Sequence, residues 1–361
     1  GTAQFTMADG SISPVTDNDI DLGTASLKYK SFFAGLTDTE NFKVNGGQGD
    51  DGQVLTSTGS GVAWEDAAGG GPTFKTFGTD SIMVGDNATG TIDAANYNTG
   101  LGVDIFADLT TGDNNTAVGY SSLPDLTTGS NNTGVGYTAL FKNTTASNNT
   151  SVGYDTLFDN TTGHSNTAIG VSALANNTTA LGNTAVGYQS LLTATTATEN
   201  TAVGYQAGVA ITTGSGNNLF GQQSGDAITT GANNVCFGSF SMDLTAGVTG
   251  SANVTVGNST MRQMTTGHSN SGLGNGVFVD NTTGILNTAM GSTAQANTTT
   301  GTRNTAVGAE TLNTNTTGEQ NTAVGVSALT SSTTVSGNTG VGFQAGQAVT
   351  TGGGTTAVGS E

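Results

Sequence analysis

The chain has 361 residues, only 9% of them charged, and a formal net charge of −19 with seven basic residues. Such an acidic chain is expected to repel nucleic acid and anionic lipid, so neither is expected as a partner. The single cysteine excludes an intrachain disulfide, and no apolar run approaches the ~20 residues needed for insertion across a bilayer.

Residues 1–66 follow no regular period and predict a small β-rich collar that serves as an attachment segment. Within it, Ile20–Leu22 and Val54–Thr56 have the composition of short strands. Residues 67–76 contain three consecutive glycines followed by Pro72 and predict a flexible linker. The remaining part, residues 77–361, is a repeat array.

From Gly85 onward, one glycine recurs in the pattern apolar-Gly-x every seventeen residues. One interval, from Gly238 to Gly257, is nineteen residues long, and the sequence leaves the role of the two extra residues open. A period this strict predicts a solenoid rather than a globular enzyme domain. We call these glycines the anchors; they are Gly85, Gly102, Gly119, Gly136, Gly153, Gly170, Gly187, Gly204, Gly221, Gly238, Gly257, Gly274, Gly291, Gly308, Gly325, Gly342 and Gly359.

Four further positions keep their chemistry and define ladders, meaning sets of equivalent residues in successive turns. The valine ladder directly precedes the anchors, and the asparagine ladder lies four residues before them. The alanine ladder of small residues lies two before the anchors, and the leucine ladder lies four after them. Examples, in that order, are Val118, Val186 and Val203; Asn115, Asn183 and Asn200; Ala117, Ala185 and Ala202; and Leu123, Leu157 and Leu191.

The residues from the asparagine to the one after the anchor alternate with the period of a strand, and Thr, Val and Tyr suit a pleated strand. Thr-Thr-Gly, eight to ten residues after the anchor, predicts a turn in which the glycine adopts a positive φ. Each repeat should therefore contribute one or two short strands and a turn. Turns stacked ~4.8 Å apart would place each valine over the next and join the asparagines by hydrogen bonds along the axis.

The predicted fold is therefore all-β, an elongated parallel β-helix or β-roll solenoid of about 17 turns. A coil of this length leaves room for about one valine and one leucine per layer, which is a thin core. The alanine ladder and the anchors would form a second face that is small, uncharged and uncovered. Three parallel chains would bury that face, so we expect a homotrimer; a monomeric β-helix and a dimer are the alternatives.

The repeat seen in Asn183–Ser190 resembles the head repeats of trimeric autotransporter adhesins, and also the repeat arrays of marine and cyanobacterial phage tail fibres. Two N-terminal stretches favour the phage family. Asp19–Lys30 is similar to a "DLG…S…K-Y/W-K" element of phage fibre proteins, and Gly52–Glu65 is similar to a segment common in phage tail fibres. The resemblance implies a homotrimer that contacts tail or baseplate proteins through its N-terminal region and a host-surface glycan or protein elsewhere.

Residues able to carry chemistry are few in the array. His164 and His268 occupy the same turn position six repeats apart, so they cannot share a metal within one chain; a ring of three in a trimer is the alternative to a solvated histidine. Cys236 belongs to the alanine ladder and is interpreted as a packed side chain. We assign no catalytic, cofactor-binding or metal residue and do not expect an enzyme. The acidic residues of the array are Asp155, Asp159, Glu199, Asp226, Asp243, Glu310 and Glu319, among others.

Tyrosines follow several anchors and form a tyrosine ladder. It is a candidate surface-binding stripe for a glycan, with strand packing as the alternative. Its members are Tyr120, Tyr137, Tyr154, Tyr188 and Tyr205.

Taken together, these features predict the structural fibre of a virion, a tail appendage that mediates host attachment. A bacterial trimeric surface adhesin or an extracellular filament, outside the cell or on its surface, is the alternative. A polysaccharide-degrading tailspike, with two carboxylates facing one intersubunit groove, is a third possibility. Because the chain begins with Gly1 and stops within a repeat, we expect it to be a piece of a longer protein.

Overall fold

In the computed structural model the chain divides into two compact units, Gly1–Gly71 and Pro72–Glu361. The structure describes residues 94–243 and 247–360, together with six strands that precede them. These strands are Phe5–Ala8 (β1), Ser11–Pro14 (β2), Gln53–Ser57 (β3), Val62–Asp66 (β4), Phe74–Thr76 (β5) and Ile82–Val84 (β6).

The first unit contains two antiparallel strand pairs, β1 with β2 and β3 with β4. The predicted strand at Val54–Thr56 is confirmed, because it lies within β3. The other predicted strand, Ile20–Leu22, lies outside the described residues.

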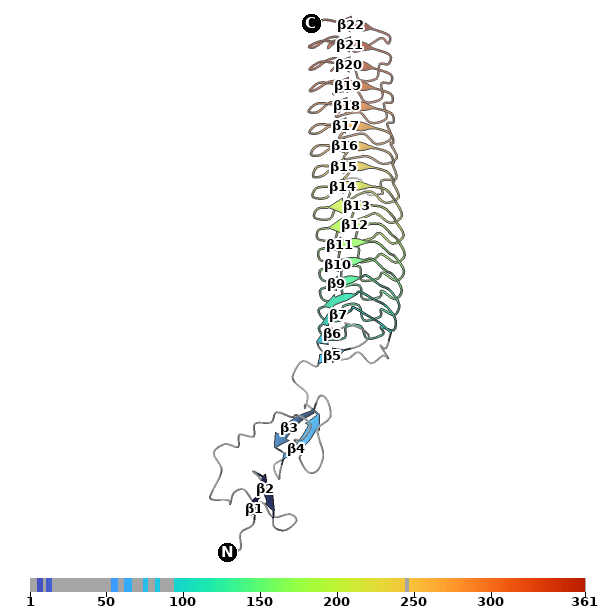
Figure 1. Cartoon of the computed structure of the whole chain (residues 1–361). Coiled ribbons are helices and arrows are strands. Elements are labelled where there is room, and N and C mark those ends of the chain that lie inside the picture. The colour runs from blue at the N-terminus through green and yellow to red at the C-terminus, as the bar shows by residue number, and fades with distance from the viewer. Residues whose placement is uncertain are drawn as a thin grey trace. The chain divides into compact units, whose positions relative to one another are not determined.

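The second unit is a solenoid in which each turn contributes one three-residue strand (Figure 1). The strands are Thr99–Leu101 (β7), Thr116–Val118 (β8), Thr133–Val135 (β9), Thr150–Val152 (β10), Thr167–Ile169 (β11), Thr184–Val186 (β12), Thr201–Val203 (β13), Asn218–Phe220 (β14), Val235–Phe237 (β15), Val254–Val256 (β16), Ser271–Leu273 (β17), Thr288–Met290 (β18), Thr305–Val307 (β19), Thr322–Val324 (β20), Thr339–Val341 (β21) and Thr356–Val358 (β22). They form 16 parallel strands in about 15 turns with a repeat of about 17 residues, which confirms the predicted fold class.

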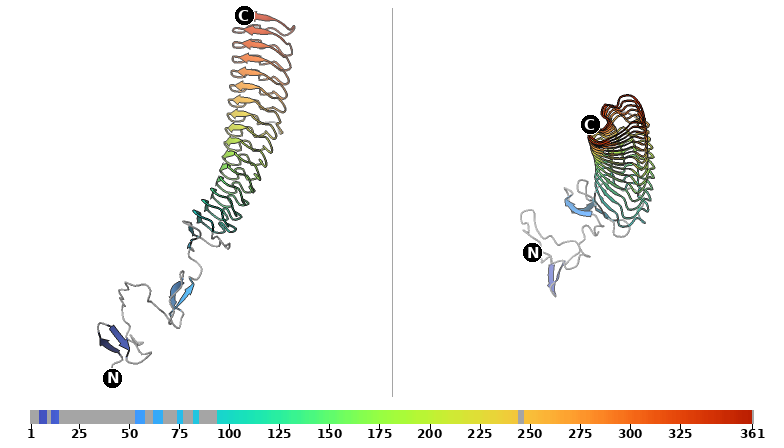
Figure 2. Two further views of the ribbon diagram at one scale, coloured as in Figure 1. Left: turned by 45° about the vertical axis from the view of Figure 1, so that its right-hand side comes forward. Right: turned by 90° about the horizontal axis from the view of Figure 1, so that it is seen from above.

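The strands pair as an open stack. From β6 to β22 each strand pairs in parallel with the next, and β5 pairs antiparallel with β6. Within the solenoid the strands are superposed on one side and the wide loops on the other (Figure 2). Since paired strands lie ~4.8 Å apart, the described stack is roughly 70 Å long. It has fewer turns than predicted because Gly85, the first anchor, lies outside the described residues.

The strand register stacks like residues on like. Val186 pairs with Val203, and Ala185 pairs with Ala202. The middle residue of each strand points into the coil, so these alanines are fully buried, whereas the threonine before and the valine after each alanine point outward and are half-buried. The predicted core of one valine and one leucine per layer is therefore wrong.

The core consists instead mainly of the alanine and leucine ladders, because a leucine leaves little room for the strand residue opposite it; the larger Leu219 of β14 is buried against Gly225, which stands in the leucine ladder. At Gly134, which stands in the alanine ladder, an added Cβ would lie 3.3 Å from the side chain of Leu123 and closer still to Ser122. A methyl group is thus about the largest side chain that fits opposite a leucine. The expected uncovered face of alanines and anchors does not exist, and the valine ladder faces outward instead.

The anchors are glycine for two reasons. Gly187 has φ 135°, a region that side chains rarely allow, and an added Cβ would lie 2.3 Å from the carbonyl oxygen of Gly204 in the next turn. The glycine of Thr-Thr-Gly was predicted to adopt a positive φ; this is confirmed at Gly352, with φ 89°, but it is wrong at Gly129 and most of its equivalents. At Gly129 close approach is the cause, since a Cβ would lie 2.1 Å from the carbonyl oxygen of Ala146.

The corners of the coil are made by residues other than glycine in the left-handed conformation. Asn131 has φ 59° in the turn before a strand, and Leu140 has φ 56° in the loop after one. A left-handed backbone is unfavourable for residues that carry a side chain, so tertiary packing must stabilise it. At Leu140 the side chain is buried in the core, and its contacts there offset the backbone strain.

Candidate functional site

The asparagine ladder is the main polar element inside the solenoid. The backbone N–H of Asn200 donates to Oδ1 of Asn183 at 2.9 Å, and Nδ2 of Asn183 donates to the carbonyl of Ala197 at 2.8 Å. Both asparagines are buried, so their hydrogen bonds replace water. The predicted bonding along the axis is confirmed, including at Asn115, whose Nδ2 donates to the carbonyl of Gly129.

The ladder continues across the nineteen-residue interval. The backbone N–H of Asn253 donates to Oδ1 of Asn234 at 3.0 Å, although the two are nineteen residues apart. β15 and β16 keep their register, with Val235 opposite Val254. The two extra residues therefore do not disturb the register of the strands.

The sequence pattern did not predict a second, shorter asparagine ladder, because this ladder occupies a variable position. Asn160 Nδ2 donates to Oδ1 of Asn143, and Asn177 Nδ2 donates to Oδ1 of Asn160, both at 2.7 Å. The series ends at Asn177, whose Oδ1 is buried without a partner because the next turn carries Ala194. Asparagine at this position in three successive turns was the available signal, but leucine at the same position in other turns obscured the pattern.

The outer side of the strands forms an extended surface, which we call the outward strand face. It consists of the valine ladder, the tyrosine-ladder positions directly after the anchors, and a threonine ladder two residues before the valines. In β8 and β12 the threonine and valine are both half-buried, on either side of a fully buried alanine. The backbone pairing extends past the strands, since the N–H of Ser121 donates to the carbonyl of Val103 at 2.8 Å.

The tyrosine ladder lies on this face as two stacks. Tyr120 and Tyr137 have ring centroids 5.1 Å apart, and Tyr137 and Tyr154 have theirs 5.3 Å apart, with nearly parallel planes. Tyr188 and Tyr205 form the second stack at 5.3 Å. Because the rings cover one another, they present edges and hydroxyl groups to solvent rather than open faces. A sugar ring can therefore meet these tyrosines along their edges, but it cannot stack flat between them.

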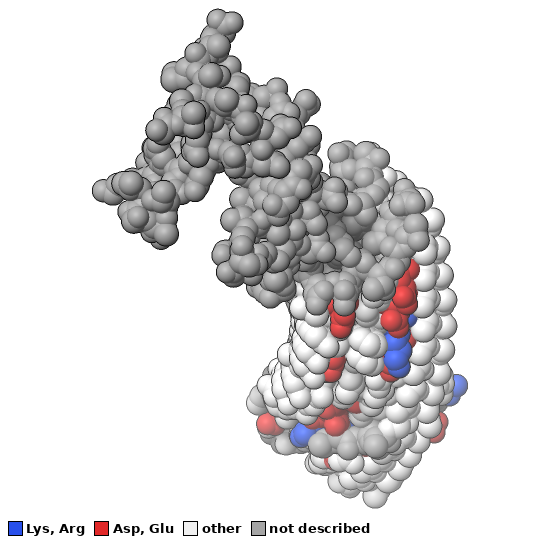
Figure 3. Space-filling model, turned by 90° about the horizontal axis from the view of Figure 1, so that it is seen from below, with Lys and Arg blue, Asp and Glu red and all other residues white. Residues whose placement is uncertain are grey.

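The charged residues gather in short rows along the solenoid, separated by broad uncharged surface (Figure 3). In one row Lys142 Nζ lies 2.7 Å from Asp159 and 5.3 Å from the ring centroid of Phe158. Exposed pairs of this kind contribute little to stability. Burial and Asp108 raise the pKa of Asp125, while Lys142 lowers it.

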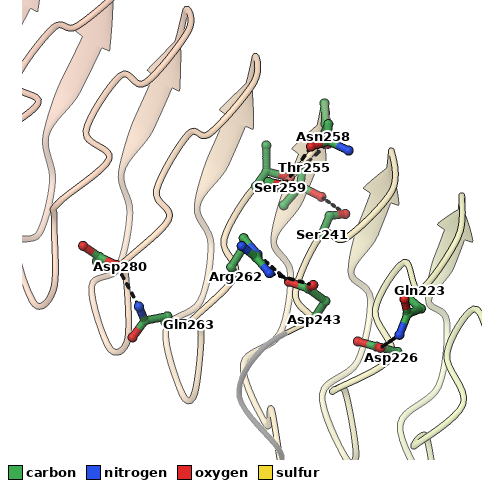
Figure 4. A network of polar contacts seen from close by, with 12 residues as sticks. Gln223, Asp226, Ser241, Asp243, Thr255, Asn258, Ser259, Arg262, Gln263 and Asp280 are labelled. Atoms are coloured by element: carbon green, nitrogen blue, oxygen red, sulfur yellow. Dashed lines mark hydrogen bonds and ion pairs between the residues drawn. The ribbon is translucent and has the colours of Figure 1, made fainter.

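An acidic network beside the nineteen-residue interval was not predicted (Figure 4). Arg262 donates to both carboxylate oxygens of Asp243, with Nε at 2.9 Å and a terminal nitrogen at 3.2 Å. Gln223 Nε2 donates to Asp226 at 3.3 Å, while the other carboxylate oxygen, Oδ1, is buried and has no hydrogen-bond partner among the described residues. Burial and, to a lesser degree, the charge of Asp243 raise the pKa of Asp226 to about 6.

Asp226→Asn is expected to stabilise the protein above pH 6 and to leave it unchanged near pH 4. The folded-state pKa of Asp226 lies above its ordinary value of 3.8, so the folded protein binds the proton more tightly. The stability from this group is full below pH 3.8 and is lost as the pH rises through about 6. Because Asp226 is only half-buried, we expect a gain of about 1 kcal/mol at pH 8. Urea unfolding at both pH values measures it, and equal curves for both proteins at pH 8 would contradict the assignment.

The other candidate residues are placed as follows. Cys236 is fully buried in the alanine ladder, as interpreted, with Sγ 3.6 Å from the sulfur of Met242, and burial raises its pKa to about 11. His164 and His268 are exposed turn residues, and among the described residues each imidazole forms a hydrogen bond only with the neighbouring serine hydroxyl. No group of three or more potential metal-binding side chains occurs in residues 94–243 and 247–360. Nor does the described part of the chain contain a helix that could cross a membrane.

Comparison of the chain with protein-family models, with curated proteins and with solved structures found no match.

Proposed function

We propose that this chain is the shaft of a virion fibre, a tail appendage that projects from a phage particle and mediates attachment to the host cell. The solenoid itself carries the proposal. One strand per turn, in register and joined by a buried asparagine ladder from Asn98 to Asn338, makes an extended rod rather than a pocketed domain. Rods of this construction hold contact surfaces at a distance.

The assignment to a virion is supported by the N-terminal unit. Asp19–Lys30 and Gly52–Glu65 are the stretches similar to phage fibre elements. In the proposal this unit contacts tail or baseplate proteins, and the solenoid carries the contact with a host-surface glycan or protein. The tyrosine edges and hydroxyls are the groups suited to meet a glycan, since nearly half of the Tyr137 side chain is exposed.

Immunogold electron microscopy of the native source tests the proposal, using antibody raised against the full chain. Gold on thin fibres at the tails of phage particles is the expected result. Gold spread over cell envelopes, with particles unlabelled, would contradict it and would favour a bacterial surface adhesin or filament, which the repeat also resembles.

A further inference from the structure

The outward strand face is apolar along its centre and uncovered. Its central valine ladder includes Ile169, Leu273 and Met290, whose exposed fractions are 40%, 43% and 46%. Parallel sheets are usually covered on both faces, and contiguous exposed apolar surface marks a contact site. In this solenoid the coil covers the inner face of the sheet and leaves the outer one bare.

The same face carries no charge, although the chain is strongly acidic. In every turn from Thr99 to Val358, the threonine-, valine- and tyrosine-ladder positions hold uncharged residues. Charged side chains begin at the rims, with Asp155 and Glu310 beyond the tyrosine ladder and Glu199 and Arg303 beyond the threonine ladder. An uncharged centre with a charged rim is the composition of a protein interface. Two copies of the chain, each with a net charge of −19, can meet there without placing charged side chains directly against one another.

The face also has the size and the spacing for a second copy. Sixteen strands enclose fifteen spacings of ~4.8 Å, and five residue positions enclose four spacings of ~3.3 Å, so the face measures roughly 950 Å². A stable interface takes about 800 Å² from each partner. A second copy has the same rung spacing, so the side chains of one valine ladder can settle between the rungs of the other along the full length.

We propose that copies of this chain pack side by side through the outward strand face, parallel to the solenoid axis. This goes beyond the proposed function, because the contact would join copies of the chain in any fibre or filament. It also places the contact on the opposite side of the strand from the alanine and anchor face on which a trimer was expected. The valine ladders occupy the centre of the contact and the tyrosine stacks its edge.

The number of chains per particle, measured by native mass spectrometry and sedimentation equilibrium on the full chain, tests the proposal. The informative variant is Val186→Lys with Val203→Lys, which places two charges in the centre of the face. Its matched control is Thr179→Lys with Thr196→Lys, which places the same charges on exposed turn residues away from the strands. Wild type and control should assemble into two or three chains. The face variant should associate at least about 100-fold more weakly, because its charges would be buried without partners.

A second variant separates weak association from poor folding. Val186→Thr with Val203→Thr keeps the branched shape of the side chains and removes only apolar surface, so it should fold normally and associate about 10-fold more weakly. Circular dichroism must show the same strand signal in all variants. A monomeric wild type at micromolar concentration, or a lysine face variant that assembles as tightly as the control, would overturn the proposal. Gold-labelled virions together with a monomeric chain would remove this proposal and leave the appendage function standing.

Discussion

Gly187→Ala is expected to destabilise the solenoid by about 4 kcal/mol, because a methyl group at this anchor would collide with the backbone of the next turn. The added Cβ would lie 2.3 Å from the carbonyl oxygen and 2.7 Å from the carbonyl carbon of Gly204. Both are backbone atoms of the next turn, so neither can rotate away. The strand pairing between β12 and β13 would have to open, and the φ of 135° adds backbone strain.

Gly359→Ala is the matched control for this prediction. Gly359 is an anchor with a similar φ of 122°, but an added Cβ would meet nothing within 4 Å. Its substitution therefore carries the backbone strain alone and should cost about 1 kcal/mol. Guanidinium unfolding of the full chain, with hydrogen exchange at β12 and β13, measures both. Equal losses at the two anchors would show that the close contact between turns is not what requires glycine.

Asn183→Ala is expected to cost about 3 kcal/mol. It removes the acceptor of the Asn200 N–H and the donor to the carbonyl of Ala197, and both groups stay buried. Each unsatisfied buried group costs roughly 1–3 kcal/mol. The loss should be local, with faster hydrogen exchange at Thr201 and its neighbours, because each turn contacts mainly the adjacent turns.

Asn176→Ala is the control for the asparagine ladder. Asn176 is exposed, and its side chain makes no hydrogen bond to the described part of the protein. Its substitution should change the free energy of unfolding by less than about 0.5 kcal/mol. Should both variants unfold at the same denaturant concentration, the asparagine ladder would not be a source of stability.

The period of the sequence was sufficient to predict the fold. Because each turn is a copy of the previous one, Val186 can only stack on Val203, and Asn183 on Asn200, once one strand per turn is assumed. The ladder positions therefore followed from spacing alone. The buried leucine ladder, including Leu191, followed from the same period.

The inward and outward sides of the strand were assigned wrongly, for a physical reason. Alternation gives the period of a strand but not its phase, and Ala185 and Val186 are both apolar. The width of the coil decides between them, and that width depends on how Leu191 and its equivalents cross the interior. The expectation of self-association survives this correction only by moving to the other face of the strand.

The acidic network lay beyond the reach of the repeat pattern. Asp226, Asp243 and Arg262 occupy the same position of the repeat, where most turns carry uncharged residues, so the repeat pattern did not predict their contact. The sequence correctly predicted that the tyrosines form a row, but only the structure shows that their rings stack.

Cryo-electron microscopy of the purified full chain tests the central claim that the second unit is a rod built of stacked turns. We expect particles with an elongated section, roughly 70 Å long, that shows one density rung every ~4.8 Å. Compact globular particles, or elongated ones without this rung spacing, would contradict it.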